Sequence, residues 1–235
     1  GRLAPSPLPA GTAAADSPRA PADPRRPEHR GGAWARWAER AAGLATLLAA
    51  DRAVRRSAQD FRRRSPEASV QADLATLGND IGTWQKSVPF LVGGALGGGA
   101  LLDGSRGLGR GASLLGGVLA GSMASEALNR VVGRGRPVWG EGAYSLDPLS
   151  GHASFPSGHA AYLFSVAGAV DAVTDGWLPA AAAYGAAGIS AYGRLYADKH
   201  WLSDVVVGAV VGATVSRMAT RRAMRLLGVA DGDGS

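Results

Sequence analysis

The chain has 235 residues and a net charge of +6, and it contains no cysteine, which excludes disulfide bonds and thiolate metal sites. Thirteen arginines and seven acidic residues fall between positions 1 and 68, and the remainder is neutral overall. These arginines lack the interleaved aromatic residues of a nucleic-acid stacking surface. We therefore expect a solvated or membrane-proximal basic segment and no nucleic-acid partner.

The N-terminal stretch, residues 1–32, is rich in Pro, Ala and Arg and has almost no large apolar side chains. This composition predicts a disordered leader. Residues 33–84 place apolar side chains at helical spacing, such as Leu74, Leu77 and Ile81, which predicts an amphipathic helical segment that Pro66 interrupts.

Five apolar blocks follow, at residues 87–102, 111–125, 160–170, 177–193 and 205–216, with charged, turn-rich connectors at 103–110, 130–155 and 171–176. Because strict alternation is rare, we predict an all-α fold, a bundle of about five to six helices over residues 85–228 with one long functional loop, then a tail at 229–235. Glycine runs at 93–94 and 97–99 lie inside an apolar block and predict helix packing rather than a phosphate loop.

The blocks are short for membrane-spanning helices, which need roughly 20 apolar residues. Flanking residues could extend several of them. We therefore expect a bundle embedded in a membrane, and the alternative is a soluble bundle with buried Ala- and Gly-rich helices.

The tetrapeptide Pro156-Ser157-Gly158-His159 stands directly before an apolar block. Ser157 suits a helix N-cap, and Gly158 lets the backbone approach a ligand closely. Free amides at a helix start form an anion site. His159, in the first turn, can exchange a proton with a bound oxyanion or its leaving group. The alternative is an ordinary capped helix with a surface histidine.

His200 and Asp204 are four residues apart and would share one face of a helix. A carboxylate that accepts from one imidazole nitrogen leaves the other nitrogen free to attack. Arg194 and Arg136 stand close to the same predicted helix ends, and guanidinium groups bind phosphate oxygens through paired hydrogen bonds. Taken singly, each of these residues is compatible with an ordinary ion pair or a surface position. Taken together, the two arginines, the histidine and the carboxylate indicate a phosphate-binding site.

Together these segments resemble the three-part signature of the PAP2 superfamily (phosphatidic acid phosphatase type 2), which is related to the haloperoxidases. That signature reads Lys-x6-Arg-Pro, then Pro-Ser-Gly-His, then Ser-Arg-x5-His-x3-Asp. The spacing matches in all three parts, within roughly residues 87–227. Two positions differ: Asn129 stands where the family has Lys, and Gly193 stands where it has Ser.

The resemblance implies a phosphatase that hydrolyses a phosphate monoester or diphosphate, preferably of a lipid, through a phosphohistidine on His200. It also implies that Asp204 orients His200 and that His159 protonates the leaving oxygen. No metal ion and no other cofactor is expected. The substrate phosphate would be bound by Arg136, Arg194, Ser157, Gly158 and Asn129, although the Asn129 amide brings no charge. Arg130 or Arg134 could supply the charge that the missing lysine would have carried.

Two alternatives share this fold. One is a vanadium haloperoxidase, against which the short chain and the missing lysine count. The other is a non-catalytic phosphate-binding or structural membrane protein, which Asn129 motivates.

The last predicted helix ends in a basic flank made of Arg217, Arg221 and Arg225. If this helix spans a bilayer, the positive-inside rule places the flank in the cytoplasm. We therefore expect a bacterial inner-membrane protein with an extracytoplasmic active site, with a soluble periplasmic protein as the alternative.

Overall fold

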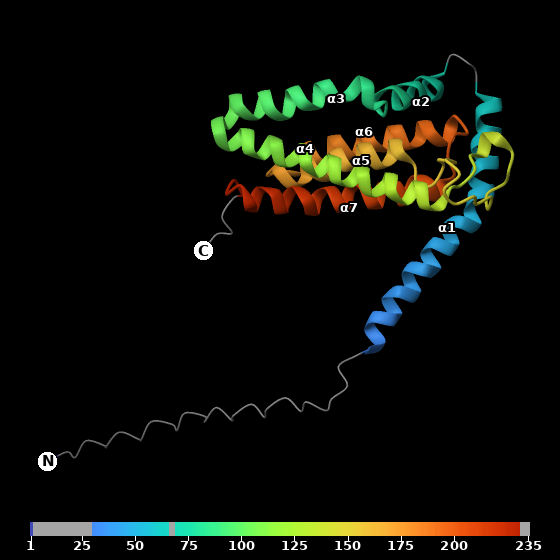
Figure 1. The fold of residues 1–235 in the computed structure, drawn as a ribbon, viewed down its shortest axis with the longest axis horizontal. Coiled ribbons are helices and arrows are strands. Elements are labelled where there is room, and N and C mark those ends of the chain that lie inside the picture. The colour runs from blue at the N-terminus through green and yellow to red at the C-terminus, as the bar shows by residue number, and fades with distance from the viewer. Residues whose placement is uncertain (2–29, 66–68, 231–235) are drawn as a thin grey trace. The chain divides into compact units, whose positions relative to one another are not determined.

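Helices account for the architecture. The computed structural model describes residues 1, 30–65 and 69–230, and these form seven α-helices and no strand, with one isolated β-bridge between Arg134 and Leu146 (Figure 1). The all-α prediction is confirmed. Most of the predicted leader and residues 231–235 of the predicted tail lie outside the described residues, so both stay predictions.

The chain divides into two units, Gly1–Arg40 and Ala41–Ser235, and the bundle belongs to the second. Helix α1 (Arg30–Arg64) ends two residues before Pro66. Helix α2 (Val70–Ile81) begins at its N-cap Ser69, whose hydroxyl accepts a hydrogen bond from the Ala72 amide at 3.3 Å. Gly82 ends α2, so the predicted stretch to residue 84 is interrupted just before the next helix.

The next helices form a hairpin. One arm comprises α3 (Trp84–Val92), the π-helical stretch η1 (Gly93–Gly98) and the first residues of α4 (Gly99–Val132). The chain reverses at Asp103 and Gly104, whose backbone is not helical, so the predicted connector at 103–110 shortens to two residues. A Cβ at Gly99 would lie 2.4 Å from the Gly107 carbonyl oxygen. Within the two glycine runs, Gly99 is the residue at which the two arms of the hairpin touch.

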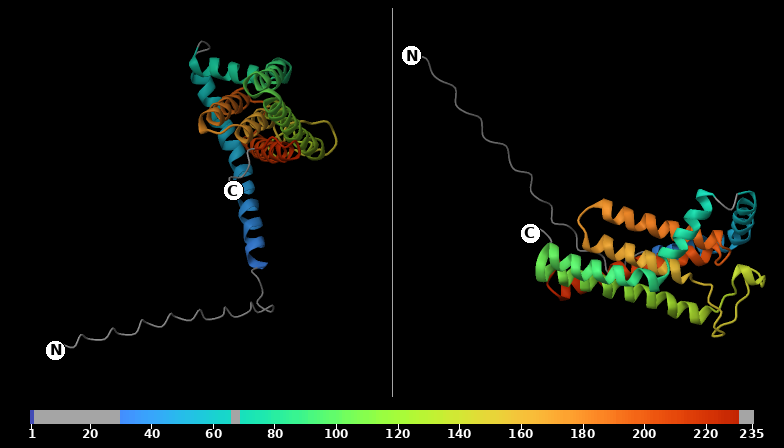
Figure 2. Two further views of the ribbon diagram at one scale, coloured as in Figure 1. Left: turned by 90° about the vertical axis from the view of Figure 1, so that its left-hand side faces the viewer. Right: turned by 90° about the horizontal axis from the view of Figure 1, so that it is seen from above.

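Helix α5 (Gly158–Val173) occupies the centre of the bundle. It packs against α4, α6 (Trp177–Tyr196) and α7 (Leu202–Leu226), an arrangement that Figure 2 shows along the bundle axis. Glycines permit this close packing: a Cβ at Gly168 would lie 2.4 Å from the Ala213 carbonyl oxygen, and one at Gly212 would lie 2.3 Å from that of Ala161. The small residues thus bring α5 and α7 together.

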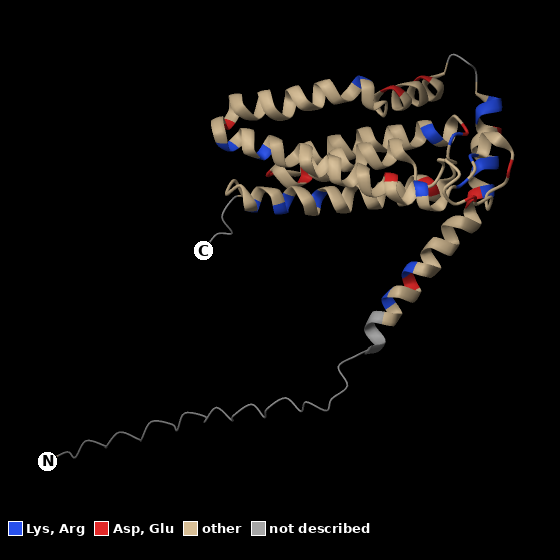
Figure 3. Ribbon diagram, in the orientation of Figure 1, with Lys and Arg blue, Asp and Glu red and all other residues tan. Residues whose placement is uncertain are grey.

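Two helical stretches, Trp84–Val132 and Leu202–Leu226, are long and apolar enough to cross a membrane. In the first stretch, no residue of the most apolar 18-residue window is buried. Leu101 and Leu102, for example, are about 90% exposed. Figure 3 shows charged residues gathered toward the two ends of the bundle, with uncharged helices between them. Exposed apolar surface of this extent is typical of membrane or partner contact, and it supports membrane association.

Candidate active site

The long loop between α4 and α5 meets the start of α7 at one end of the bundle. Ser157 occupies the N-cap position of α5, as predicted, but its hydroxyl makes no capping hydrogen bond. Its backbone amide donates instead to the Asp204 carbonyl oxygen at 2.9 Å. This bond ties the Pro-Ser-Gly-His turn to the first turn of α7, so the second and third motifs share one site.

His200 lies buried just before α7, with 4% of its surface exposed. Its Nδ1 is 2.8 Å from the backbone carbonyl oxygen of Ser154, and a carbonyl can only accept. The proton must therefore sit on Nδ1, which leaves a lone pair on Nε2. Asp204 Oδ2 lies 3.6 Å from the same Nδ1, so the direct hydrogen bond goes to Ser154.

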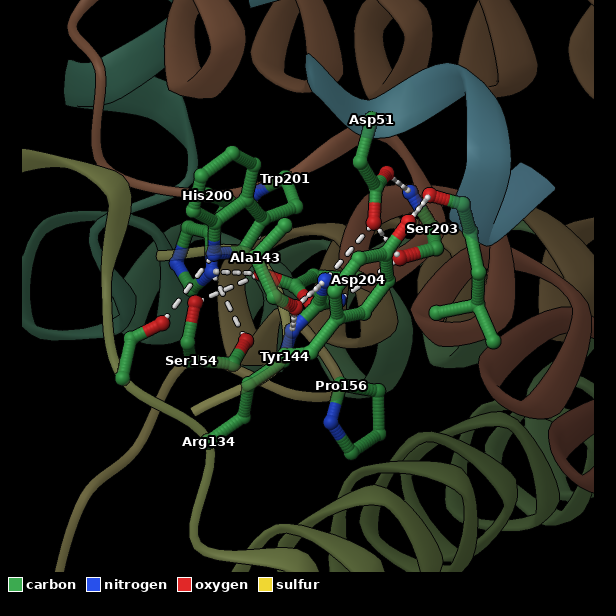
Figure 4. Close-up of polar contacts among 12 residues, drawn as sticks. Asp51, Arg134, Ala143, Tyr144, Ser154, Pro156, His200, Trp201, Ser203 and Asp204 are labelled. Carbon is green, nitrogen blue, oxygen red and sulfur yellow. Dashed lines mark hydrogen bonds and ion pairs between the residues drawn. The ribbon is translucent and has the colours of Figure 1, made fainter. Parts of the chain in front are cut away.

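Asp204 is also connected to His200 through neighbouring residues. Its Oδ2 accepts hydrogen bonds from the Ser154 hydroxyl at 2.5 Å and from the Trp201 amide at 2.9 Å. Its Oδ1 accepts from Arg134 Nη1 at 2.6 Å. The carboxylate thus holds both chain segments that flank the imidazole, an arrangement visible in Figure 4.

The predicted phosphate-binding arginines have unpaired buried nitrogens. The Nε atoms of Arg136 and Arg194 are buried without a hydrogen-bond partner among the described residues, and so is the Ser157 hydroxyl. A buried donor left unpaired is costly unless a ligand satisfies it. Burial and the neighbouring Arg136 lower the pKa of Arg194 to about 10, so its guanidinium stays charged at neutral pH.

His159 lies in the first turn of α5, and its ring adjoins the end of α2: a Cβ at Gly82 would lie 2.9 Å from His159 Cδ2. Burial, followed by the positive charge of Arg194, lowers the pKa of His159 to about 4. Burial also lowers the pKa of His200, against the opposing effect of Asp204. Both imidazoles are therefore neutral at pH 7, and one can serve as a base or nucleophile without first losing a proton.

A cavity of about 350 Å³ opens beside His159. Its walls come from the end of α2 and the start of α3, from α4 and from α5, and they are lined by Gly82, Trp84, Ser122, Met123, Glu126, Gly158, His159 and Tyr162. Most of this lining surface is apolar. A group bound next to the His159 imidazole would lie in this cavity.

The structure thus places most of the predicted site residues at one end of the bundle. The positive charges of Arg194 and Arg136 lower the pKa of both histidines, so these four side chains lie within electrostatic range of one another. Sequence reasoning missed three residues that support them, namely Asp51 on α1, Asn79 on α2 and Ser154 in the long loop. It also missed the role of Arg134, which joins two buried carboxylates instead of supplying the missing lysine charge.

The sequence alone gives little warning of these supporting residues. Each is a single polar residue with no motif spacing to mark it. The same holds for Asp198, which is buried and accepts two hydrogen bonds from Arg55, both 2.8 Å long.

A comparison with protein families places these motifs in a known group. The model of the PAP2 superfamily matches residues 110–226, which run from α4 through α7 and include all three motifs. Residues 110–226 belong to the PAP2 superfamily. The resemblance stated from the motifs is confirmed.

The crystal structure of LpxE from Aquifex aeolicus is similar, with 17% sequence identity and a TM-score of 0.48, and the similarity covers 68% of this chain and 90% of that one. No curated protein matches the chain. The PAP2 family, taken with the site, supports a phosphatase of the PAP2 type.

The first departure from the PAP2 signature, Asn129, has a defined structural role. This buried amide donates a hydrogen bond from Nδ2 to the Pro156 carbonyl oxygen at 3.2 Å, which fixes the Pro-Ser-Gly-His turn. Neither nearby arginine takes over the missing lysine charge. Arg130 pairs with Glu126 on the surface, and Arg134 is held in the buried network.

The second departure, Gly193, is explained by α2. A Cβ at Gly193 would lie 2.6 Å from the Ala75 carbonyl oxygen, so the PAP2 serine does not fit here without displacement of α2. The close approach brings Asn79 to the site, where its Oδ1 accepts a hydrogen bond from Arg194 Nη1 at 2.8 Å. Asn79 therefore orients the guanidinium that the phosphate would contact.

Proposed function

We propose that the chain is a phosphatase that hydrolyses a lipid phosphate monoester or diphosphate through a phosphohistidine on His200. The supporting observation is the hydrogen bond from His200 Nδ1 to the Ser154 carbonyl at 2.8 Å, which leaves Nε2 free to attack. The unpaired buried nitrogens of Arg136 and Arg194 supply the complementary anion site.

The two half-reactions follow from this arrangement. Nε2 of His200 attacks phosphorus of the substrate monoanion, the bond from phosphorus to the leaving oxygen breaks, and that oxygen takes the monoanion's proton, which His159 accepts and passes on. Water then attacks phosphorus while His159 removes its proton, the phosphorus–nitrogen bond breaks, and inorganic phosphate leaves. Arg136 and Arg194 neutralise the charge on the phosphoryl oxygens in both transition states. Ser157 and the Gly158 amide donate to the same oxygens.

The preference for a lipid rests on the cavity beside His159. Trp84, Met123 and Tyr162 give it apolar walls, and α4 belongs to one of the two candidate membrane spans. An alkyl chain in this cavity would keep its leaving oxygen next to the acid. A bilayer would present such a substrate at the charged end of the bundle.

A turnover screen of the purified protein tests this function. We expect release of inorganic phosphate from lipid phosphates in mixed micelles, slower release from short-chain soluble esters, and the same rates with and without EDTA. Activity that EDTA removes and one divalent cation restores would contradict the mechanism. Phosphate binding without turnover would identify the non-catalytic alternative, and vanadate-dependent oxidation of bromide would identify a haloperoxidase.

We also propose that the catalytic end of the bundle faces the extracytoplasmic side of a bacterial inner membrane. The opposite end carries Arg217, Arg221 and Arg225 in the last turns of α7, and Arg110 reaches the same end through its hydrogen bond to the Val229 carbonyl. Arginines on α1 lie at the catalytic end and oppose this reading. However, the positive-inside rule counts charges within about 15–20 residues of a span, and the last arginine of α1, Arg64, stands 20 residues before Trp84, at the limit of that range.

Cysteine labelling tests the orientation, since the chain has no native cysteine. Ser150 lies exposed in the loop between α4 and α5, and Ser105 lies exposed beside the turn of the hairpin. We expect Ser150→Cys to react with an impermeant thiol reagent in intact cells and Ser105→Cys to react after permeabilisation only. The reverse pattern would invert the topology, and a protein soluble without detergent would remove the membrane premise.

The lowered pKa of His159 sets the pH dependence. Because free His159 is neutral above about pH 4, the proton for the leaving group must enter with a substrate monoanion, whose second ionisation has a pKa of about 6. We expect kcat/KM to be greatest between these values, to fall below about pH 4 as His159 becomes protonated, and to fall above about pH 6 as the substrate becomes a dianion.

A substrate series checks this assignment. Fluorinated alkyl phosphates have a lower second pKa, so the alkaline limb of the kcat/KM profile should move to lower pH with them. An alkaline limb that stays fixed would mean that a protein group sets it. An acid limb near the ordinary histidine pKa of about 6.5 would contradict a neutral His159 in the free enzyme.

A further inference from the structure

Asp51 is a buried carboxylate that the mechanism above does not use. It lies on α1, outside the segment matched by the PAP2 model, and its side chain is fully buried. Its Oδ1 accepts from the Ser203 amide at 2.8 Å, and its Oδ2 accepts from the Ser203 hydroxyl and from Arg134 Nη2, both at 2.7 Å. A charge buried so completely is retained only where such partners hold it.

Arg134 connects Asp51 to the catalytic carboxylate. Its side chain is 2% exposed, and its two terminal nitrogens donate to different acids, Nη1 to Asp204 at 2.6 Å and Nη2 to Asp51 at 2.7 Å. Its Nε also donates to the Ala143 carbonyl at 2.9 Å. The planar guanidinium is thus fixed on three sides, as Figure 4 shows.

The chain of contacts continues to the nucleophile. Asp204 accepts from the Ser154 hydroxyl, and the Ser154 carbonyl accepts from His200 Nδ1. Hydrogen bonds therefore run from Asp51 through Arg134, Asp204 and Ser154 to His200 without a gap. Every side chain in this series is at least nine-tenths buried.

Helix α1 also contacts the segment that precedes His200. Arg55, one turn beyond Asp51, donates from Nε and Nη2 to the two oxygens of Asp198, which stands two residues before His200. Its guanidinium carbon lies 5.3 Å from the centre of the Trp201 ring, directly after His200. The same face of α1 thus contacts the chain on both sides of His200.

We propose that Asp51 is a positioning residue for the proposed nucleophile, and that α1 is a working part of the active site. With Asp51 neutralised, Arg134 keeps one carboxylate instead of two and moves toward Asp204. Because Asp204 also holds Ser154, that shift displaces the carbonyl that fixes the His200 tautomer. Buried networks of this kind respond as a unit when one member changes. The inference rests on His200 being the nucleophile of the proposed function.

Asp51→Asn tests the proposal, with Asp60→Asn as the matched control. Asp60 is an exposed residue of the same helix, so the control makes the same change away from the network. We expect Asp51→Asn to lower kcat by about 10–100-fold with KM within about threefold, as for loss of residues that orient catalytic groups. Asp60→Asn should remain within about twofold of the unmodified protein on the same measure.

The ring nitrogen NMR spectrum supplies a readout that does not depend on turnover. The chain has four histidines, so His200 can be assigned by substitution. We expect a single Nδ1-protonated tautomer in the unmodified protein and a mixture in Asp51→Asn. An unchanged tautomer with kcat within twofold would overturn the proposal. If the unmodified protein lacks turnover, the proposed function fails, and the tautomer comparison still decides the role of Asp51.

A second variant covers the case in which Asp51→Asn does not fold. Ser203→Ala removes one hydroxyl that joins Arg134 to Asp51 and leaves every charge in place. We expect a loss of about three- to tenfold in kcat and a smaller change in the His200 tautomer. A folded Ser203→Ala protein with unchanged kcat and tautomer would overturn the proposal.

Discussion

His200→Ala should lower kcat by about 10⁴-fold or more, because it removes the atom that forms the covalent bond to phosphorus. The described residues offer no replacement, since His159 must supply the proton and His152 lies in the loop against Trp139, with ring centres 5.2 Å apart. The measurement is phosphate release by the purified variant from a soluble ester and from a lipid phosphate.

The matched control is His152→Ala. This substitution removes a histidine at the same end of the bundle that has no role in the proposed mechanism. We therefore expect kcat to stay within about threefold of that of the unmodified protein. Near-normal turnover by His200→Ala would eliminate His200 as the nucleophile. Equal losses in both variants would instead indicate a general effect on the fold of the loop.

His159→Ala should affect substrates according to their leaving groups. An alkyl phosphate needs a proton on its leaving oxygen, and we expect a loss of about 10²–10⁴-fold for such esters. A nitrophenolate leaves without a proton, so formation of the phosphohistidine from nitrophenyl phosphate should continue. Hydrolysis of that intermediate still needs His159 as the base.

Rapid mixing of His159→Ala with nitrophenyl phosphate separates the two steps. We expect a fast burst of one nitrophenolate per protein, followed by a slow steady rate. The unmodified protein should hydrolyse both classes of ester at a steady rate. A His159→Ala protein that loses activity equally on both classes, with no burst, would show that His159 does not act as the acid.

Much of the fold follows from periodicity. The apolar blocks at 160–170, 177–193 and 205–216 became α5, α6 and α7, each longer than its uncharged block. Charged residues at helix ends caused the difference: α4 continues through Arg130, and α5 continues through Asp171, because the charges reach solvent while the backbone stays helical. The length of an uncharged block in the sequence is therefore shorter than the helix that forms there.

The active site was only partly predictable from the sequence. His159, His200 and the two arginines could be selected because their spacing matches a signature that folding brings together. Asp51 and Asn79 could not be selected, because their roles depend on partners 83 and 115 residues away along the chain. Neither residue stands out in the sequence, since Asp51 precedes Arg52 and Asn79 precedes Asp80.

Asn129 shows why a motif alone can mislead. Compared with the family pattern, it reads as a missing charge. In the structure it pairs with the Pro156 carbonyl and so holds the turn that presents Ser157. The amide therefore has a structural contact of its own, which a signature that compares one position at a time does not show.

The most direct test of the account is to trap the covalent intermediate. The protein would be mixed with ³²P-labelled substrate, quenched within milliseconds in alkali and digested. We predict label on the peptide that contains His200, stable in base and lost in acid as a phosphohistidine should be, and absent from His200→Ala. Turnover without any such label, or label on another residue, would contradict the account.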